Sequence, residues 1–138
     1  MAAGAQDTTS ILREFAASGA LDSLERPNFS RYRDSVIRLY QSTGYRPVWL
    51  QGNSPKAQAK VIIGALERSE SKGLDPRDYD GSSWSRRIAA LPSGEPSAQA
   101  EFDLALTVCA MRYVSDLEFG RIREERFRNR IEDQTYRL

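Results

Sequence analysis

The sequence has no histidine and a single cysteine, Cys109, among its 138 residues. Without histidine it lacks the side chain that most often serves as a general base near neutral pH and as a metal ligand. One cysteine cannot form an intramolecular disulfide, and a zinc site would require an unusual set of carboxylates. We therefore expect no metal site, no cofactor, and no active site in which a histidine activates a nucleophile.

Cys109 itself lies in an apolar run, Leu106–Met111. A reactive cysteine needs electropositive, partly exposed surroundings that lower its pKa, whereas apolar surroundings bury the thiol. We expect Cys109 to be a small, inert core residue.

Long apolar runs and strong net charge are also missing. No stretch approaches the ~20 apolar residues of a membrane-spanning helix, so an integral membrane domain is not expected. The net charge is +1 and 40% of the residues are hydrophobic, which argues against a disordered chain and against a nucleic-acid-binding protein. The sequence shows no glycine-rich phosphate loop, no cluster of metal ligands and no internal repeat.

The length suits a single domain, and the spacing of apolar residues is mostly helical. A domain near this size typically buries about 68–70% of its unfolded surface, enough for one core. We predict a mostly α fold, a single irregular helical bundle of about five to six helices organised around one long central helix.

Two helices are predicted before residue 44. The first runs from about Thr9 to Ser18 and stops at Gly19; the second is capped by Asn28 or Ser30 and ends at Gly44. Their apolar stripes contain Ile11, Leu12 and Phe15 in the first, and Phe29, Tyr32, Val36, Leu39 and Tyr40 in the second.

Tyr45–Leu50 cannot continue the second helix, because Pro47 keeps the preceding residue extended and has no N–H to donate. We expect it to lay Val48 and Trp49 against the helices. After a turn, Ser54 is predicted to cap a third helix with Pro55 at its first position. That helix is expected to reach about Ser71 before Gly73 and to bury Val61, Ile62, Ala65 and Leu66.

Gly73–Tyr79 is predicted to be a tight corner, in which the Asp75 carboxylate accepts backbone N–H bonds and Pro76 fixes φ. A fourth helix, from about Ser82 to Leu91, would carry Trp84 and Ile88. The segment from Pro92 to Pro96 is expected to be a loop.

The fifth helix is predicted over Ser97–Phe119, a stretch without proline or glycine, and Gly120 is expected to end it. Its apolar stripe consists of Phe102, Leu106, Cys109, Tyr113 and Leu117, and Leu104, Ala105, Val108 and Ala110 widen it. So wide an apolar arc indicates contacts on more than one side, as expected of the central helix.

Beyond Gly120 the composition changes, with six arginines against four acidic residues and only a thin set of apolar ones, Ile122, Phe127 and Ile131. We expect a partly exposed helix and tail with a solvated charged face. The alternatives are a linker toward a neighbouring domain and a patch attracted to an anionic surface.

Three stretches resemble one known family. They are Gly44-Tyr45-Arg46-Pro47-Val48-Trp49-Leu50, Lys72-Gly73-Leu74-Asp75-Pro76-Arg77-Asp78-Tyr79 and Glu101-Phe102-Asp103-Leu104-Ala105-Leu106-Thr107. In order and spacing, with Tyr113, Asp116-Leu117 and Gly120-Arg121 following, they are similar to the scaffold domain that precedes the catalytic domain in large L,D-transpeptidases, which cross-link bacterial peptidoglycan. The resemblance covers about Val36–Ile122. Family members often have a proline soon after the glycine, where this chain has Arg123-Glu124.

The resemblance implies a non-catalytic module, because the Ser/Thr-His-Gly-Cys type motif of the catalytic domain is absent. It divides the chain into an N-terminal helical segment (1–27), a scaffold-like domain (28–122) and an arginine-rich C-terminal helix or tail (123–138). It also implies a periplasmic or cell-envelope location, although Met1–Ser10 has neither the positive region nor the apolar core of a signal peptide. We expect that an export segment precedes this chain.

Six residues near the corners are candidate binding residues: Tyr45, Arg46, Trp49, Asp75, Tyr79 and Trp84. The aromatic ones could stack on the sugar rings of a glycan, but large aromatics also fill gaps between short helices. Arg46 could bond exposed carbonyls and Asp75 could cap a helix. Asp103 and Asp116, placed on a polar flank of the long helix, lie about 20 Å apart along it and cannot share a proton.

Two classes of function follow. In the first, the chain is a scaffold that packs against a catalytic domain, of the same or a partner protein, and orients it. In the second, it is an autonomous domain that binds peptidoglycan or a partner protein. A large exposed apolar patch beside Val48 and Trp49 would favour docking to a domain, and an aromatic groove with hydrogen-bond donors would favour glycan.

Overall fold

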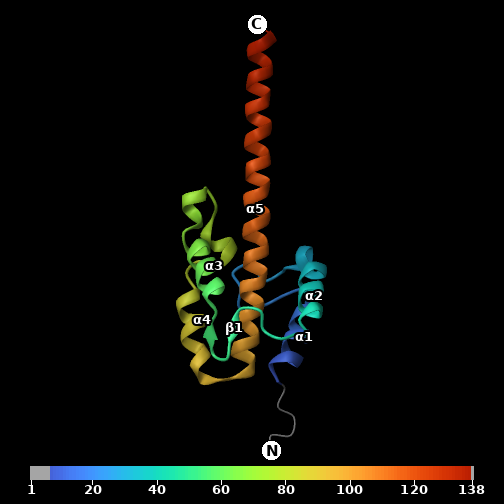
Figure 1. Cartoon of the computed structure of the whole chain (residues 1–138), viewed down its shortest axis with the longest axis vertical. Helices are drawn as coiled ribbons and strands as arrows, with labels where there is room; N and C mark the ends of the chain where they lie inside the picture. The colour runs from blue at the N-terminus through green and yellow to red at the C-terminus, as the bar shows by residue number, and fades with distance from the viewer. Residues whose placement is uncertain (1–6, 138) are drawn as a thin grey trace, which may run out of the picture.

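The computed structural model describes the backbone of residues 7–137 and the side chains of residues 7–120. Within that part the chain is a mostly α, single helical bundle, as predicted (Figure 1). Its five α-helices are α1 (Thr8–Ser18), α2 (Arg33–Ser42), α3 (Ala57–Glu67), α4 (Trp84–Ala90) and α5 (Pro96–Arg137). Short 3-10 helices η1 (Ser30–Tyr32), η2 (Ser69–Lys72), η3 (Pro76–Tyr79) and η4 (Leu91–Ser93) join them, with a two-stranded hairpin of β1 (Leu50–Gln51) and β2 (Ser54–Pro55).

Helix α5 is the centre of the bundle. Helices α1 and α2 lie on one side of it and α3 and α4 on the other (Figure 1). Its buried residues therefore point in several directions: Phe102, Leu104, Ala105, Leu106, Val108 and Cys109 are all at most 1% exposed. The predicted central helix with contacts on more than one side is confirmed.

The prediction that Gly120 ends this helix is wrong, because α5 continues as one helix to Arg137. Glycine inside a helix is only about 1 kcal/mol less favourable than alanine, and no proline follows to interrupt the hydrogen-bond ladder. The stretch from residue 121 to 137 extends well beyond the other helices (Figure 1). The side chains of Ile122, Phe127 and Ile131 lie outside the described residues.

The first helix begins and ends by local chemistry. The Asp7 carboxylate accepts from the Ser10 backbone N–H at 2.8 Å, and Gly19 closes α1 with φ 74. The following segment, residues 20–29, packs back on the bundle and buries Leu21, Leu24 and Phe29. The described N-terminal residues thus share one core with the rest.

Helix α2 ends in a Schellman motif. The Tyr45 N–H bonds the Tyr40 carbonyl at 2.7 Å and the Gly44 N–H bonds the Gln41 carbonyl at 3.2 Å. Gly44 has the left-handed φ of 65 that this motif requires. The apolar contact that accompanies such motifs is made by the rings of Tyr40 and Tyr45, stacked 6.2 Å apart. The predicted role of Gly44 is confirmed.

The predicted cap at Ser54 and helix start at Pro55 are wrong. Both residues form β2, in which Ser54 pairs with Gln51 and Pro55 with Leu50, and α3 begins at Ala57. Gly52, with φ 63, makes the two-residue turn possible. Because the Lys56 N–H bonds the Trp49 carbonyl at 2.8 Å, the adjacent Pro55 occupies a non-hydrogen-bonded position and needs no N–H.

The predicted burial along α3 is confirmed for Leu66, which is 0% exposed, and in part for Ile62 and Ala65, which pack half-buried on the core. The buried residues of α3 are Ala59, Ile63 and Leu66, spaced at i, i+4 and i+7. Val61, predicted to be buried, is 70% exposed because it lies opposite that stripe.

Candidate functional site

Asp103 of α5 is the centre of a buried polar network. The prediction that it lies on a polar flank of the helix is wrong. Its side chain is fully buried. It accepts hydrogen bonds from the Tyr40 hydroxyl at 2.5 Å, from the Val48 backbone N–H at 2.9 Å and from the Trp49 backbone N–H at 2.8 Å. One carboxylate therefore joins α5 to the end of α2 and to the Arg46–Trp49 corner.

Thr107, one turn along α5, extends this network. Its hydroxyl accepts from the Trp49 indole N–H at 2.9 Å and lies 2.8 Å from the Tyr40 hydroxyl. Because the Tyr40 hydroxyl donates to Asp103, the Thr107 hydroxyl can donate to Tyr40, which gives a continuous chain from the indole to the carboxylate. Every polar side-chain atom of this chain has a partner, the condition under which a buried network rigidifies a core.

The pKa directions follow from burial. Burial raises the pKa of the Asp103 carboxyl, and its three hydrogen bonds oppose that shift. Burial together with the Asp103 charge raises the pKa of Tyr40 well above its ordinary value. Asp103 thus has the surroundings of a structural acceptor that receives backbone N–H groups.

The candidate residues Tyr45 and Arg46 lie at the outer end of this corner. Tyr45 is half-buried, has φ 60, and carries the Arg13 guanidinium 4.9 Å from its ring centroid. Arg46 is exposed, and within the described part of the chain its guanidinium makes no hydrogen bond or ion pair. Trp49 is half-buried against the core, with its indole N–H directed inward to Thr107.

The second corner is capped as predicted. The Asp75 carboxylate accepts from the Arg77 backbone N–H at 3.0 Å and pairs with the Arg77 guanidinium at 2.9 Å, while Pro76 begins η3. These bonds lower the pKa of the Asp75 carboxyl. The prediction that Asp75 caps the next helix is confirmed.

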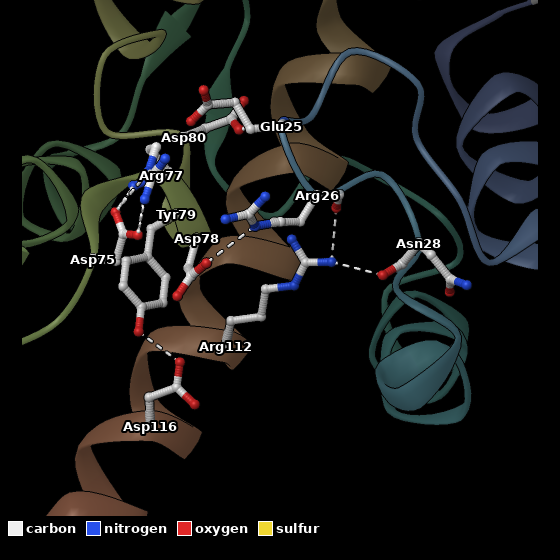
Figure 2. A network of polar contacts seen from close by, with 10 residues as sticks. All are labelled: Glu25, Arg26, Asn28, Asp75, Arg77, Asp78, Tyr79, Asp80, Arg112 and Asp116. Carbon is white, nitrogen blue, oxygen red and sulfur yellow. Dashed lines mark hydrogen bonds and ion pairs between the residues drawn. The ribbon is translucent and has the colours of Figure 1, made fainter.

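Tyr79 and Trp84, the other two candidates, are 0% exposed. The Tyr79 hydroxyl donates to the Asp116 carboxylate at 2.5 Å (Figure 2), and burial together with this carboxylate raises the pKa of Tyr79. The Trp84 indole N–H donates to the Tyr79 carbonyl at 3.0 Å. In this conformation neither ring has a face available to a glycan.

An ion pair that the sequence did not reveal lies beside Trp84. Arg87, 6% exposed, bonds Asp80, the Ser23 carbonyl at 3.2 Å and Glu101 of α5 at 3.2 Å. Asp80, whose φ is 53, also accepts from the Glu25 backbone N–H at 2.9 Å. The pair therefore holds the segment 20–29 against α4 and α5.

Arg112 of α5 holds the same segment from the other end. One of its terminal nitrogens donates to the Arg26 carbonyl at 2.9 Å and to the Asn28 carbonyl at 2.8 Å (Figure 2). The Arg26 guanidinium in turn pairs with Asp78 of η3 at 3.2 Å. No sequence signal marks Arg112, because its partners are backbone carbonyls about 85 residues away.

An apolar groove of about 880 Å³ lies between η1, the start of α2 and the part of α5 where that helix leaves the bundle. Its lining residues are Arg31, Tyr32, Ser35, Ala110, Met111, Val114, Ser115, Asp116, Glu118 and Phe119. Val114 and Phe119 are each 60% exposed. A large exposed apolar patch beside Val48 and Trp49 would have favoured docking to another domain, but the groove lies elsewhere.

Neither a metal-binding cluster nor a membrane-spanning helix is found among the described residues. No group of three or more cysteine or carboxylate side chains there could hold a metal ion. None of the helices in that part is both long enough and apolar enough to cross a membrane.

Comparison with known proteins gives one family. Neither the curated proteins nor the solved structures include a match to this chain. A family model described as "Scaffold domain" matches residues 34–137, well over half of the chain. That range includes the Asp103 network, both proline-containing corners and the whole of α5, and the chain belongs to the Scaffold domain family.

Proposed function

We propose that this chain is a non-catalytic scaffold module of a peptidoglycan cross-linking L,D-transpeptidase, and that it supports and orients the catalytic domain in the periplasm or cell envelope. The family match supports the scaffold role. The assignment to an L,D-transpeptidase rests on the resemblance of the three sequence stretches.

This proposal rests on the hydrogen bonds that the buried and half-buried polar groups of α5 make within the chain. Asp103, Thr107, Arg112 and Asp116 all bind other segments of the same chain. A binding or catalytic site keeps polar groups directed toward a ligand, whereas these fix α5 to the segment 20–29 and to both corners. The result is a rigid body that carries one long projecting helix.

The single thiol supports the absence of catalysis. Cys109 is fully buried, and burial raises the pKa of its thiol to about 12. A nucleophilic cysteine needs the opposite shift, because only the thiolate attacks a carbonyl.

The alternative, direct binding of peptidoglycan, has less support. Of the four aromatic candidates, Tyr79 and Trp84 are buried, and Trp49 directs its indole N–H into the protein. Of the six candidates, Arg46 is exposed, and Tyr45, Trp49 and Asp75 are half-buried.

Mixing experiments test the scaffold role. The purified chain is added to an L,D-transpeptidase catalytic domain encoded by the same or a neighbouring reading frame. We expect co-elution and increased cross-linking of tetrapeptide-bearing muropeptides, whereas the chain alone should form no product. Asp103→Ala should weaken the effect because it releases the Arg46–Trp49 corner, and Asp22→Asn, at an exposed position, is the control.

Absence of both binding and stimulation would contradict the proposal. Co-sedimentation with purified sacculi tests the alternative separately. Strong pelleting that Arg46→Ala abolishes, without loss of stability, would favour direct binding.

A further inference from the structure

The groove and the projecting part of α5 are adjacent features of one helix. The groove follows α5 from Ala110 to Phe119, and the helix then continues over residues 121–137 away from the other elements (Figure 1). That continuation is roughly 26 Å long at ~1.5 Å per residue. An isolated helix of this length is marginally stable in water, so packing against a partner would stabilise it.

The groove has the features of a surface that receives a helix. It lies between two helical elements, and its apolar lining includes Tyr32, Met111, Val114 and Phe119. Val114 and Phe119 are among the three large hydrophobic residues with exposed side chains in the described part of the chain. The third, Val61, is on α3.

We propose that a second copy of this chain occupies the groove, with the two α5 helices antiparallel and crossing near Phe119. A two-fold axis at this point lets one interface accommodate both features, because residues 120–128 of each copy then lie along residues 110–118 of the other, the part of α5 that lines the groove. In this register, residue 119+k of one copy comes level with residue 119−k of the other. Phe127 of one copy then comes level with Met111 of the other, and Arg123 of one copy comes level with Ser115 of the other.

Charge supports the same occupant. Two of the three charged residues that line the groove are acidic, Asp116 and Glu118 against Arg31. Residues 121–128, which come level with the groove in this register, have four arginines against two acidic residues. An arginine-rich helix is attracted to the acidic rim of the groove, and this charge complementarity also fixes the register of the two α5 helices.

Sedimentation equilibrium on the full chain tests the proposal over a concentration series. Wild type should dimerise. Val114→Glu and Phe127→Glu should each raise the dimer dissociation constant at least about tenfold, the effect expected for a central apolar contact. Val61→Glu is the matched control, since it places the same charge at another exposed valine, on α3, and should leave the constant unchanged. Circular dichroism checks that each variant is folded.

Disulfide trapping tests the antiparallel register. A chain with Ser115→Cys mixed with a chain with Arg123→Cys should form a crossed disulfide on oxidation, more readily than either forms with itself. Cys109 does not interfere because it is buried. The proposal is overturned if wild type stays monomeric at all concentrations, as it would if another protein occupied the groove. It is also overturned if the dimer survives both Val114→Glu and Phe127→Glu, or if Val61→Glu dissociates it. Cysteine variants that each link mainly to themselves would overturn it as well.

Discussion

Replacing Asp103 removes the acceptor that holds the Arg46–Trp49 corner on α5. Two backbone N–H groups, of Val48 and Trp49, lose their partner, together with the Tyr40 hydroxyl. The hydroxyl retains Thr107 at 2.8 Å, so the main cost comes from the two N–H groups. A buried polar group without a partner costs about 1–3 kcal/mol.

Two effects reduce this cost. The corner is only half-buried, so water can reach part of it. Burial also raises the pKa of the Asp103 carboxyl, which means that its ionised form is itself destabilised at neutral pH. We therefore expect Asp103→Ala to lower the free energy of unfolding by about 3–4 kcal/mol.

Asp103→Asn should have a smaller effect. If the asparagine carbonyl takes the place of Oδ2, it still accepts from Tyr40 and Val48. The side-chain NH2 group then takes the place of Oδ1 and faces the Trp49 N–H, so that two donors meet. The expected loss is about 1–3 kcal/mol. For a domain near this size, each kcal/mol corresponds to roughly 4 °C in melting temperature.

Urea unfolding, followed by circular dichroism and by tryptophan fluorescence, measures these losses. Asp22→Asn, an exposed change of the same chemistry, should stay within about 0.5 kcal/mol of wild type. If Asp103→Ala melts like the Asp22→Asn control, the carboxylate does not hold the corner and the reasoning fails.

Three further predictions concern the core, the corner and the thiol. Leu106→Ala should lower stability by about 2–5 kcal/mol in urea unfolding, because Leu106 is 0% exposed at the centre of α5. Trp49→Ala should lower the free energy of unfolding by about 2–4 kcal/mol, less than the loss expected for a fully buried tryptophan. The substitution should leave any co-sedimentation with sacculi unchanged. Unchanged stability together with lost pelleting would instead indicate a tryptophan that binds glycan. In the folded state the pKa of the Cys109 thiol is raised to about 12. The buried neutral thiol therefore contributes fully to the free energy of unfolding below about pH 9, and this contribution is lost as pH rises toward 12. Cys109→Ala should therefore flatten the decline of unfolding free energy between pH 9 and 11, by up to about 1.4 kcal/mol per pH unit, and an unchanged slope would contradict the buried thiol.

The sequence by itself determined the elements whose causes are local. A stripe from Phe102 to Tyr113 without proline or glycine is enough to predict the part of α5 that lies inside the bundle and its burial, because helical spacing brings those residues onto contacting faces. Asp75-Pro76 likewise makes its own corner, since the carboxylate bonds a backbone N–H two residues away. The inert environment of Cys109 follows from its apolar neighbours in the same helix.

Only the tertiary structure decided which hydrogen-bond partners the polar side chains of α5 have. Asp103 is buried because two backbone N–H groups, 54 and 55 residues away in the chain, reach its carboxylate, and no spacing rule within the helix reveals them. The partners of Arg112 are backbone carbonyls, which every residue has, so the sequence carries no sign of them. Pro55 forms a strand because the hairpin pairs its neighbour Lys56 with Trp49, a contact seven residues apart that outweighs the preference of proline for a helix start. Local preferences of about 1 kcal/mol yield to such contacts, because burial and hydrogen bonding across the fold contribute more.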